Sequence, residues 1–330
     1  MKIFVTGGTG YIGSHTCIEL LASGHEVVIA DNLVNSKKEV LGHIETISGK
    51  TVPFYPVDVT KEEDTRAIFE AHDFDGVIHF AGLKAVGESV AMPLAYYYNN
   101  LVSTMVLSKL CVAFQVPRLV FSSSATVYGD QPSPLREDLP LMRTTNPYGE
   151  TKAMSERILM DTVASHEDFG VTLLRYFNPV GAHESGLIGE DPNGIPNNLM
   201  PFVTRVAKGK LDKLSIFGSD YDTVDGTGVR DYIHVVDLAK GHVKAIEALS
   251  SGVHVYNLGT GRGTSVLELV HAFMKVNQVQ VPYEIVGRRP GDIATCYADA
   301  TKAYEELQWK TELTMEDMVR DAWHFEHHAP

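Results

Sequence analysis

The sequence predicts an α/β fold built on a doubly wound parallel sheet, and three observations carry that prediction. A short apolar run, Lys2 to Thr6, leads straight into a glycine-rich turn. Segments with strand and helix patterns then alternate through the first half of the chain. Finally, the predicted strands end in small or acidic residues. Such alternation gives parallel strands joined by right-handed crossovers, with helices on both faces.

The glycine-rich turn has the spacing Gly7-x-x-Gly10-x-x-Gly13 and precedes a helix predicted over Tyr11 to Ala22, which Gly24 ends. A strand, a glycine turn and a helix N-terminus bring backbone N–H groups and the positive helix end to one place, which suits a pyrophosphate. Gly7 is expected to permit the turn, Gly10 to admit the phosphates, and Gly13 to let helix and strand pack closely.

The second predicted strand, Glu26 to Ala30, ends in Asp31, which lies 18 residues after Gly13. An acid at this position accepts hydrogen bonds from the adenosine ribose and repels a 2′-phosphate, so NAD is favoured over NADP. The alternative is a carboxylate that only caps the chain after a strand.

Further strands are predicted at 52–57, 76–80 and 118–122, and helices at 61–71 and 93–114. Because ligands of such folds bind at the carboxyl ends of the strands, Asp31, Asp58, Phe80 and Ser124 are expected along one edge of the sheet.

Tyr148 and Lys152 lie four residues apart at the start of a predicted helix, and therefore share one helical face. Of the 14 tyrosines, Tyr148 alone has a lysine at this spacing. A phenol is a poor base near neutral pH, but a nearby ammonium or an oxidised nicotinamide ring lowers its pKa. Ser124 can hydrogen-bond the same substrate oxygen, so Tyr148, Ser124 and Lys152 are the candidate catalytic residues. The alternative is a packed tyrosine beside a solvated lysine.

The amino-acid composition of the chain disfavours several kinds of partner and site. The net charge of −14 disfavours nucleic acid and anionic membranes as partners. Three widely spaced cysteines argue against a disulfide framework or a zinc site, and the N-terminus enters a strand at once, so a cytoplasmic protein is expected. His324, His327 and His328 have helical metal-ligand spacing but are interpreted as a solvated tail, so no metal is expected.

An ordered set of motifs now carries a family resemblance over essentially the whole chain. The motifs are GGTGYIGSH (7–15), HFAGLKAVGES (79–89), FSSSATVYGD (121–130), NPYGETK (146–152), LRYFNPVGAH (174–183), NNLMPF (197–202), RDYIHVVD (230–237), YNLGTG (256–261) and GRRPGD (287–292). With these motifs the chain resembles the UDP-glucose 4-epimerases of the extended short-chain dehydrogenase/reductase family. The resemblance implies a Rossmann-type sheet, tightly held NAD, and a redox-neutral cycle. In that cycle Tyr148 takes the proton of the sugar 4-hydroxyl while C4 loses a hydride, the 4-keto sugar turns, and the hydride returns to the opposite face.

The resemblance also implies two sets of binding residues. Those expected to contact NAD are Gly7, Gly10, Tyr11, Ile12, Gly13, Asp31, Asn32, Asn35, Ser36, Asp58, Val59, Phe80, Ala81, Gly82, Lys84, Asn99, Ser122, Tyr148, Lys152 and Tyr176. Those expected to contact the UDP-sugar are Lys84, Ser124, Tyr148, Phe177, Asn178, Asn197, Asn198, Leu199, Phe217, Arg230, Arg289, Asp292 and Cys296. Arg230 and Arg289 suit a diphosphate because guanidinium forks match phosphate oxygens; the alternative is plain surface charge.

Two positions refine the expected reaction. Related dehydratases carry Asp-Glu after the catalytic Ser or Thr, and decarboxylases carry Glu at the second position. Ala125 and Thr126 occupy these positions here, so the chain lacks the acid and base for elimination.

Cys296 falls where the family lines the sugar pocket. A small residue there leaves room for an N-acetyl group, so UDP-N-acetylglucosamine and UDP-N-acetylgalactosamine are expected substrates as well. The alternative is a core cysteine.

Residues 1–177 are assigned to the NAD-binding Rossmann domain, and 178–330 mainly to a smaller mixed α/β UDP-sugar lobe that returns to the first domain around 230–260. In this lobe strands are predicted at 214–217, 253–258 and 282–286, and helices at 237–249, 265–276 and 314–325. The family implies a homodimer through helices expected at 93–114 and 149–169.

Three alternatives stay open. The first is an epimerase for another nucleotide sugar, such as UDP-glucuronate, although no dedicated arginine for a sugar carboxylate is evident. The second is an NAD-dependent dehydrogenase that releases NADH. The third is a non-catalytic NAD-binding regulator, which the intact Tyr148–Lys152 pair and Ser124 disfavour.

Overall fold

Seven short apolar segments form a single parallel sheet in the computed structural model, which describes residues 1–193, 196, 198–289 and 291–328. The strands follow the order β11-β6-β5-β4-β1-β2-β3. They are β1 (Lys2–Thr6), β2 (Glu26–Ala30), β3 (Phe54–Tyr55), β4 (Gly76–His79), β5 (Arg118–Ser122), β6 (Gly170–Tyr176) and β11 (Gly252–Leu258). All neighbours pair in parallel, which confirms the expected α/β fold. The order reverses between β1 and β4, and this switch point is where such sheets bind ligands.

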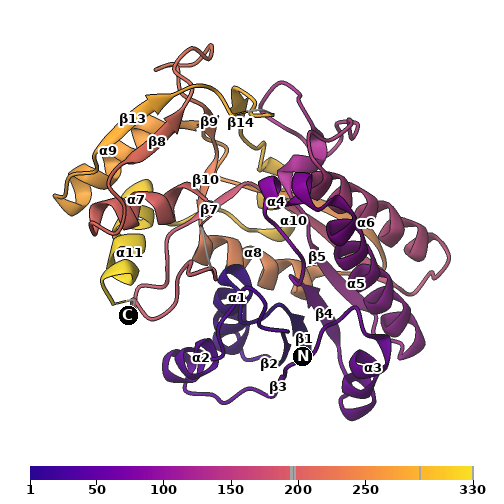
Figure 1. Ribbon diagram of the computed structural model, residues 1–330. Helices are drawn as coiled ribbons and strands as arrows, with labels where there is room; N and C mark the ends of the chain where they lie inside the picture. The colour runs from indigo at the N-terminus through magenta and orange to yellow at the C-terminus, as the bar shows by residue number, and fades with distance from the viewer. Residues whose placement is uncertain (194–195, 197, 290, 329–330) are drawn as a thin grey trace.

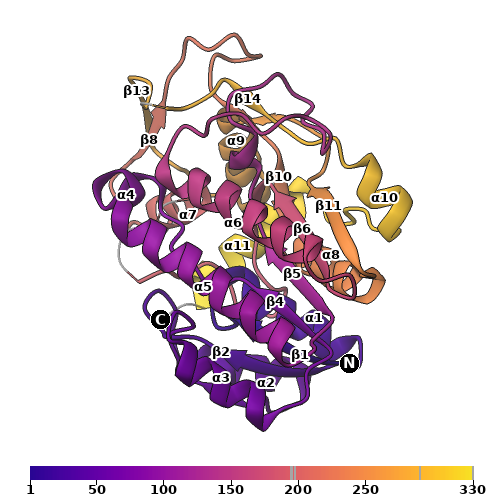
Figure 2. The same ribbon diagram turned by 90° about the vertical axis from the view of Figure 1, so that its right-hand side faces the viewer.

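Helices cover both faces of the sheet because its strands are apolar on both sides. Along β1, Ile3 and Val5 face one cluster of buried side chains and Phe4 faces the other. Figure 1 shows α1 and α8 on one side of the sheet and α3, α5 and α6 on the other. In Figure 2, α5 and α6 run side by side across the second face. The helices associated with this sheet are α1 (Tyr11–Ala22), α2 (Val40–Ser48), α3 (Glu62–Ala71), α4 (Val86–Ala91), α5 (Pro93–Ala113), α6 (Pro147–Ala164) and α8 (Val235–Ala248).

The remaining elements form a smaller layered unit around a separate apolar cluster that includes Val203, Ile216, Phe273 and Val319. Its helices are α7 (Leu199–Ala207), α9 (Val266–Asn277) and α11 (Met315–His328), while α10 (Thr301–Leu307) lies beside β11. Its strands pair as β7 (Asn178–Val180) with β10 (Tyr232–His234), β8 (Leu214–Phe217) with β13 (Tyr283–Val286), and β9 (Val229–Arg230) with both β12 (Thr264–Ser265) and β14 (Thr295–Cys296).

Several predicted boundaries need correction. The strand expected at 52–57 shrinks to Phe54–Tyr55, because Pro53 and Pro56 flank it and cannot donate to a ladder. The helix expected to reach residue 169 ends at Ala164. Strand β6 was not predicted, although it pairs with β5 on one side and β11 on the other.

Candidate active site

Two glycines of the first turn are required by backbone geometry. Gly7 has φ +73°, and a Cβ there would lie 2.7 Å from the nitrogen of Ala81. A Cβ on Gly13 would lie 2.2 Å from the oxygen of Gly7, so a larger residue would separate α1 from the turn. Gly10 caps α1 with an ordinary φ of −73°, and its Cβ would come within 3.2 Å of the Gly7 oxygen. The three positions thus form a backbone cradle at a helix N-terminus, which fits a pyrophosphate.

Asp31 follows β2 directly and organises the neighbouring loop. Its carboxylate accepts hydrogen bonds from the backbone N–H groups of Thr9 (3.2 Å) and Leu33 (2.9 Å) and from the Ser36 hydroxyl (3.0 Å). The side chain is almost fully buried, yet it lines the cavity described next. It is therefore fixed in orientation at the end of the strand, as a ribose acceptor must be.

One cavity of about 1310 Å³ runs along the carboxyl ends of β1, β2, β4, β5 and β6. It brings the glycine turn, Asp31 and the three candidate catalytic residues together, although up to 145 positions separate Gly7 from Lys152. Every residue expected to contact NAD lines it except Ser122. Of those expected to contact the UDP-sugar, Lys84, Ser124, Tyr148, Phe177, Asn178 and Asn198 line it.

Ser122 lies just behind the cavity wall and serves two of the residues that form it. Its hydroxyl hydrogen-bonds the Tyr176 phenol at 2.9 Å, and its carbonyl oxygen accepts a hydrogen bond from Lys152 Nζ at 2.7 Å. The end of β5 therefore fixes both the tyrosine of β6 and the lysine of α6.

Helix α6 presents Tyr148 and Lys152 because its N-terminus is capped strongly. The Asn146 side chain accepts from the Gly149 N–H at 2.9 Å, and Pro147 occupies the first helical position. Both candidate catalytic side chains are buried. Burial lowers the pKa of Lys152 to about 8, although the Glu156 carboxylate opposes this shift. Burial also raises the pKa of Tyr148, while a hydrogen bond with Ser124 lowers it. The protein's side chains alone thus keep the phenol neutral near pH 7, and its acidification beside an oxidised nicotinamide stays a prediction.

Ser124 is held so that its own proton is available. Its hydroxyl oxygen accepts hydrogen bonds from the Thr126 backbone N–H (3.3 Å) and the Thr126 hydroxyl (3.0 Å). Because these bonds use acceptor sites of the oxygen, the Ser124 hydroxyl can donate toward Tyr148 or a substrate oxygen. Thr126 thus orients the serine.

One wall of the cavity, the segment from Gly186 to Asn193, was not predicted from the sequence. Glu190 in this segment accepts hydrogen bonds from Lys84 Nζ (3.2 Å) and Asn198 Nδ2 (2.6 Å). Asp191 pairs with Lys37, and Asn193 reaches the carbonyl oxygen of Val34 at 3.3 Å. No local sequence pattern marks this wall, because its contacts with Lys84, Lys37 and Val34 each span more than 100 positions.

The other residues expected at the UDP moiety form a second group outside this cavity. The Arg289 guanidinium lies 5.7 Å from the centre of the Phe217 ring and forms two hydrogen bonds to Asp292 (2.8 and 3.1 Å). Arg230 lies 3.8 Å from the same carboxylate. Leu199 begins α7, and Asn197 lies outside the described residues. The two arginines are therefore gathered at one place by Asp292 rather than scattered as surface charges.

Cys296 lies beside Arg230 in register, on β14 next to β9. It packs against an apolar cluster that contains Ala125 and Phe177, and Phe177 also lines the cavity. Burial raises the pKa of its thiol to about 11, so the side chain is a small neutral group near pH 7. All three cysteines are free.

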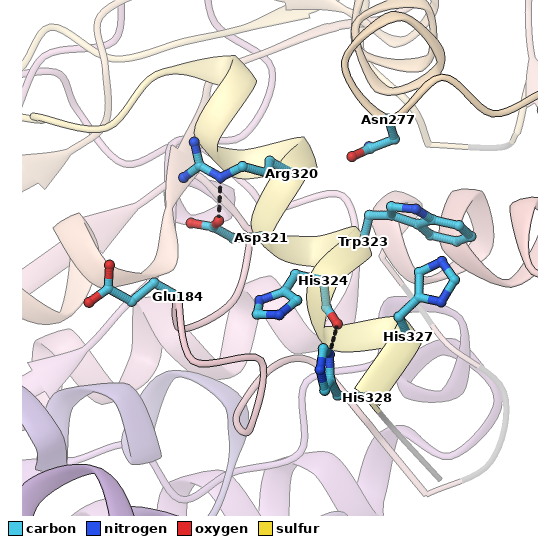
Figure 3. A pocket seen from close by; sticks show the side chains of 8 residues that line it. All are labelled: Glu184, Asn277, Arg320, Asp321, Trp323, His324, His327 and His328. Atoms are coloured by element: carbon cyan, nitrogen blue, oxygen red, sulfur yellow. Dashed lines mark hydrogen bonds and ion pairs between the residues drawn. The ribbon is translucent and has the colours of Figure 1, made fainter.

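The three histidines near the C-terminus lie in the last turns of α11 rather than in an irregular tail, but His327 and His328 are exposed to solvent as expected and His324 is half-buried. Figure 3 shows them around a cavity of about 700 Å³ with Trp323, Asn277 and Glu184. Rings pair along the helix, Trp323 with His327 and His324 with His328. Among the described residues, no group of three or more His, Cys, Asp or Glu side chains is placed to hold a metal ion. Within the same residues, no helix has the length and apolarity needed to cross a bilayer.

A glycine cradle at the first strand, an acid at the second, and a Ser–Tyr–Lys group at the fifth strand and its following helix define a dinucleotide-dependent site for proton and hydride transfer at a carbinol. Residues 3–259 match the NAD dependent epimerase/dehydratase family. The chain belongs to this family.

Individual relatives are similar to this chain over nearly its full length. The chain is 58% identical to a UDP-glucose 4-epimerase of Bacillus subtilis, covering 99% of this chain and 97% of that protein. It is 56% identical to a UDP-glucose 4-epimerase of Haemophilus influenzae, covering 100% and 98%. The crystal structure of UDP-glucose 4-epimerase from Bifidobacterium longum in complex with NAD⁺ and UDP matches with a TM-score of 0.97 at 54% identity, covering 100% and 99%.

Proposed function

We propose that this protein interconverts UDP-galactose and UDP-glucose, oxidising the sugar at C4 and reducing it again with retained NAD. The observation that carries the proposal is the single cavity joining the glycine turn and Asp31 to Ser124, Tyr148 and Lys152. The full-length similarity to UDP-glucose 4-epimerases supports this choice among the reactions such a site can run.

The cavity fits a dinucleotide at both ends. The cradle of Gly7, Gly10 and Gly13 would hold the pyrophosphate, and Asp31 would accept hydrogen bonds from the adenosine ribose. Lys152, Tyr176 and Phe80 would form the wall at the nicotinamide end. When bound, NAD⁺ would supply the acceptor for the hydride that leaves C4 of the sugar, and afterwards the donor that returns the same hydride.

Tyr148 is the proposed acid–base residue. The 4-hydroxyl proton passes to the phenolate oxygen of Tyr148 as the carbon–hydrogen bond at C4 breaks, leaving a 4-keto sugar. Ser124 donates a hydrogen bond to the same sugar oxygen, since Thr126 occupies its acceptor sites. Lys152, buried and held by the Ser122 carbonyl, places a positive charge beside the phenolate. Reversal on the other face of the sugar gives the epimer with no net oxidation.

The second group of residues is proposed to hold the UDP moiety while the 4-keto sugar turns. Arg230 and Arg289 offer guanidinium donors for the diphosphate, and Phe217 offers a ring for the uracil. Asp292 keeps both arginines at this place. Asn178, Asn198 and Leu199 complete the set proposed to hold the UDP moiety, with Asn197 outside the described residues.

We further propose that UDP-N-acetylglucosamine and UDP-N-acetylgalactosamine are interconverted, because Cys296 is small and packs against the apolar cluster that contains Phe177 of the cavity wall. Three organisational proposals accompany this function. The division at residues 177 and 178 separates the NAD-binding part from the sugar lobe, the protein is a homodimer through α5 and α6, and it acts in the cytoplasm. Exposed apolar side chains on α4 and α5, such as Val90 and Leu94, support the dimer.

The test is epimerisation of UDP-galactose by the purified protein with no cofactor added. Formation of UDP-glucose without accumulation of NADH supports the proposal. Accumulation of NADH in proportion to sugar would indicate a dehydrogenase, and turnover of UDP-glucuronate in place of UDP-galactose would indicate a different epimerase. Binding of NAD with turnover of no nucleotide sugar would indicate a regulator.

A further inference from the structure

A buried ion pair lies directly behind the catalytic residues and has no part in the chemistry proposed above. Glu156 on α6 is 0% exposed and Arg175 on β6 is 3% exposed. Arg175 donates two hydrogen bonds to the Glu156 carboxylate, from Nε at 3.0 Å and from a terminal nitrogen at 2.7 Å. Burial alone lowers the pKa of Arg175, but this carboxylate raises it well above its ordinary value. The desolvation cost of such a buried charge pair is offset only where its geometry is good and its remaining lone pairs are hydrogen-bonded.

Glu156 contacts the turn that carries Ser124. The hydroxyl of Ser123 donates to the Glu156 carboxylate at 2.5 Å, and Ser123 is also fully buried. Its backbone N–H donates to the Leu174 oxygen at 2.9 Å, which fixes the turn against β6. Ser124 is the next residue, so the direction of its side chain depends on how Ser123 is held.

Glu156 also lies one helical turn from Lys152, on the same face of α6. Lys152 donates to Ser122, and Glu156 accepts from Ser123. Two side chains of α6 therefore bind two consecutive residues at the end of β5, and both contacts lie beside the catalytic serine.

Arg175 links the ion pair to Tyr128 and, through it, to β11. Its guanidinium lies 4.9 Å from the centre of the Tyr128 ring, and the Tyr128 hydroxyl donates to Asn257 at 2.6 Å. Tyr176, the next residue of β6, lines the cavity and hydrogen-bonds Ser122. The ion pair thus joins α6, the end of β5, β6 and β11 behind one wall of the active site.

We propose that Glu156, through its ion pair with Arg175 and its hydrogen bond from Ser123, is a positioning residue that holds Ser124 and Lys152 in the geometry for proton transfer. This inference rests on the proposed function. It goes beyond that function because it assigns a role to a carboxylate that touches neither the sugar nor the cofactor cavity.

Electrostatics gives the proposal a measurable consequence. The titratable groups that interact with the Lys152 charge are Glu156 on its own helix and His79 on β4. Tyr148 and Tyr176 line the same cavity as Lys152. Burial lowers the pKa of the Lys152 ammonium, and the Glu156 charge raises it. Replacing Glu156 by Gln removes that charge and leaves Arg175 unpaired, so Lys152 loses its proton at lower pH. The alkaline limb of activity then moves to lower pH.

The experiment compares Glu156→Gln with Asp161→Asn, an exposed carboxylate on the same helix that loses the same charge. For Glu156→Gln we expect kcat for UDP-galactose to fall on the order of 10²-fold with little change in KM, and the alkaline limb to shift. For Asp161→Asn we expect neither effect. A purely structural role would scale the whole pH profile without moving its limb.

Two further measurements keep the test decisive. The double variant Glu156→Gln/Arg175→Met removes both charges, so we expect it to regain stability but not kcat. Carbon-13 labelling of the lysine side chains, with Lys152→Met to assign the signal, reads the Lys152 titration by NMR independently of turnover. Recovery of kcat together with stability, or an unchanged Lys152 titration in Glu156→Gln, would overturn the inference. A wild-type protein that turns over no nucleotide sugar would instead overturn the proposed function, while the NMR titration would still decide the position of Lys152.

Discussion

Lys152 Nζ lies 2.7 Å from the backbone oxygen of Ser122, and this contact joins the catalytic helix to the strand that leads into Ser124. The two residues are 30 positions apart in the chain. Because Lys152 donates a hydrogen bond to a backbone carbonyl, its side chain is held in place before any ligand binds. Preorganisation of this kind is what proton transfer at a fixed carbinol requires.

The close packing at Gly13 predicts a strong effect of Gly13→Ala. The new methyl group would lie 2.2 Å from the Gly7 oxygen and force the turn away from α1. We expect the purified variant to lose its bound NAD, measured by release of nucleotide on denaturation. Gly42→Ala is the matched control, because a Cβ there meets no atom within 4 Å. Since Gly42 lies inside α2, its replacement should stabilise the protein by about 0.5–1 kcal/mol and leave NAD content unchanged.

Tyr148→Phe tests the acid–base assignment. Removing the hydroxyl should lower kcat by about 10²- to 10⁴-fold while UDP binding is retained, because the residues proposed to bind UDP form a separate group. Steady-state kinetics and calorimetry with UDP measure the two effects. Tyr304→Phe, at a tyrosine that is 59% exposed on α10, serves as the control. Wild-type turnover in Tyr148→Phe would remove this residue from the mechanism.

Lys152→Met should separate activity from stability. Burial lowers the folded-state pKa of Lys152 from 10.5 to about 8, so folding disfavours its charged form and Met at this position should raise the melting temperature near neutral pH. The sign follows from proton binding. Between pH 8 and 10.5 the unfolded chain holds more protons at Lys152 than the folded chain, so wild-type stability rises with pH relative to the variant. Thermal melts across this window check the trend. A variant whose advantage grows with pH would contradict it, and activity should be lost throughout.

Cys296→Tyr tests the breadth of the sugar pocket. A tyrosine would project several additional heavy atoms toward the cluster that contains Phe177, and overfilling a packed region is destabilising for the larger ligand. We expect kcat/KM for UDP-N-acetylgalactosamine to fall on the order of 10²-fold, and that for UDP-galactose to change little. The UDP-galactose rate is the internal control. Equal losses on both sugars would place Cys296 outside the pocket.

Local chemistry made much of this site predictable from the sequence. The turn at Gly7 and the acid at Asp31 are read from a strand–turn–helix pattern of short range, and the structure has β1, α1 and β2 at the predicted bounds. Tyr148 and Lys152 are fixed by one helix, so their spacing alone brings them together.

Long-range contacts account for what the sequence analysis missed. Glu190 meets Lys84 across 106 positions, and Arg175 meets Glu156 between a helix and a strand that was not predicted. Such pairs depend on tertiary packing rather than on local periodicity. The short strand at Phe54–Tyr55 shows the opposite error, because the apolar run predicts a longer strand than its flanking prolines allow.

The central claim is that one site removes a hydride from C4 and returns it to the same carbon. UDP-galactose carrying deuterium at C4 tests this most directly, with purified protein in ordinary water and no added NAD. The account predicts UDP-glucose that retains the deuterium at C4, with no NADH accumulating in solution. Product that has lost its deuterium to solvent would contradict hydride return, and so would accumulation of deuterated NADH.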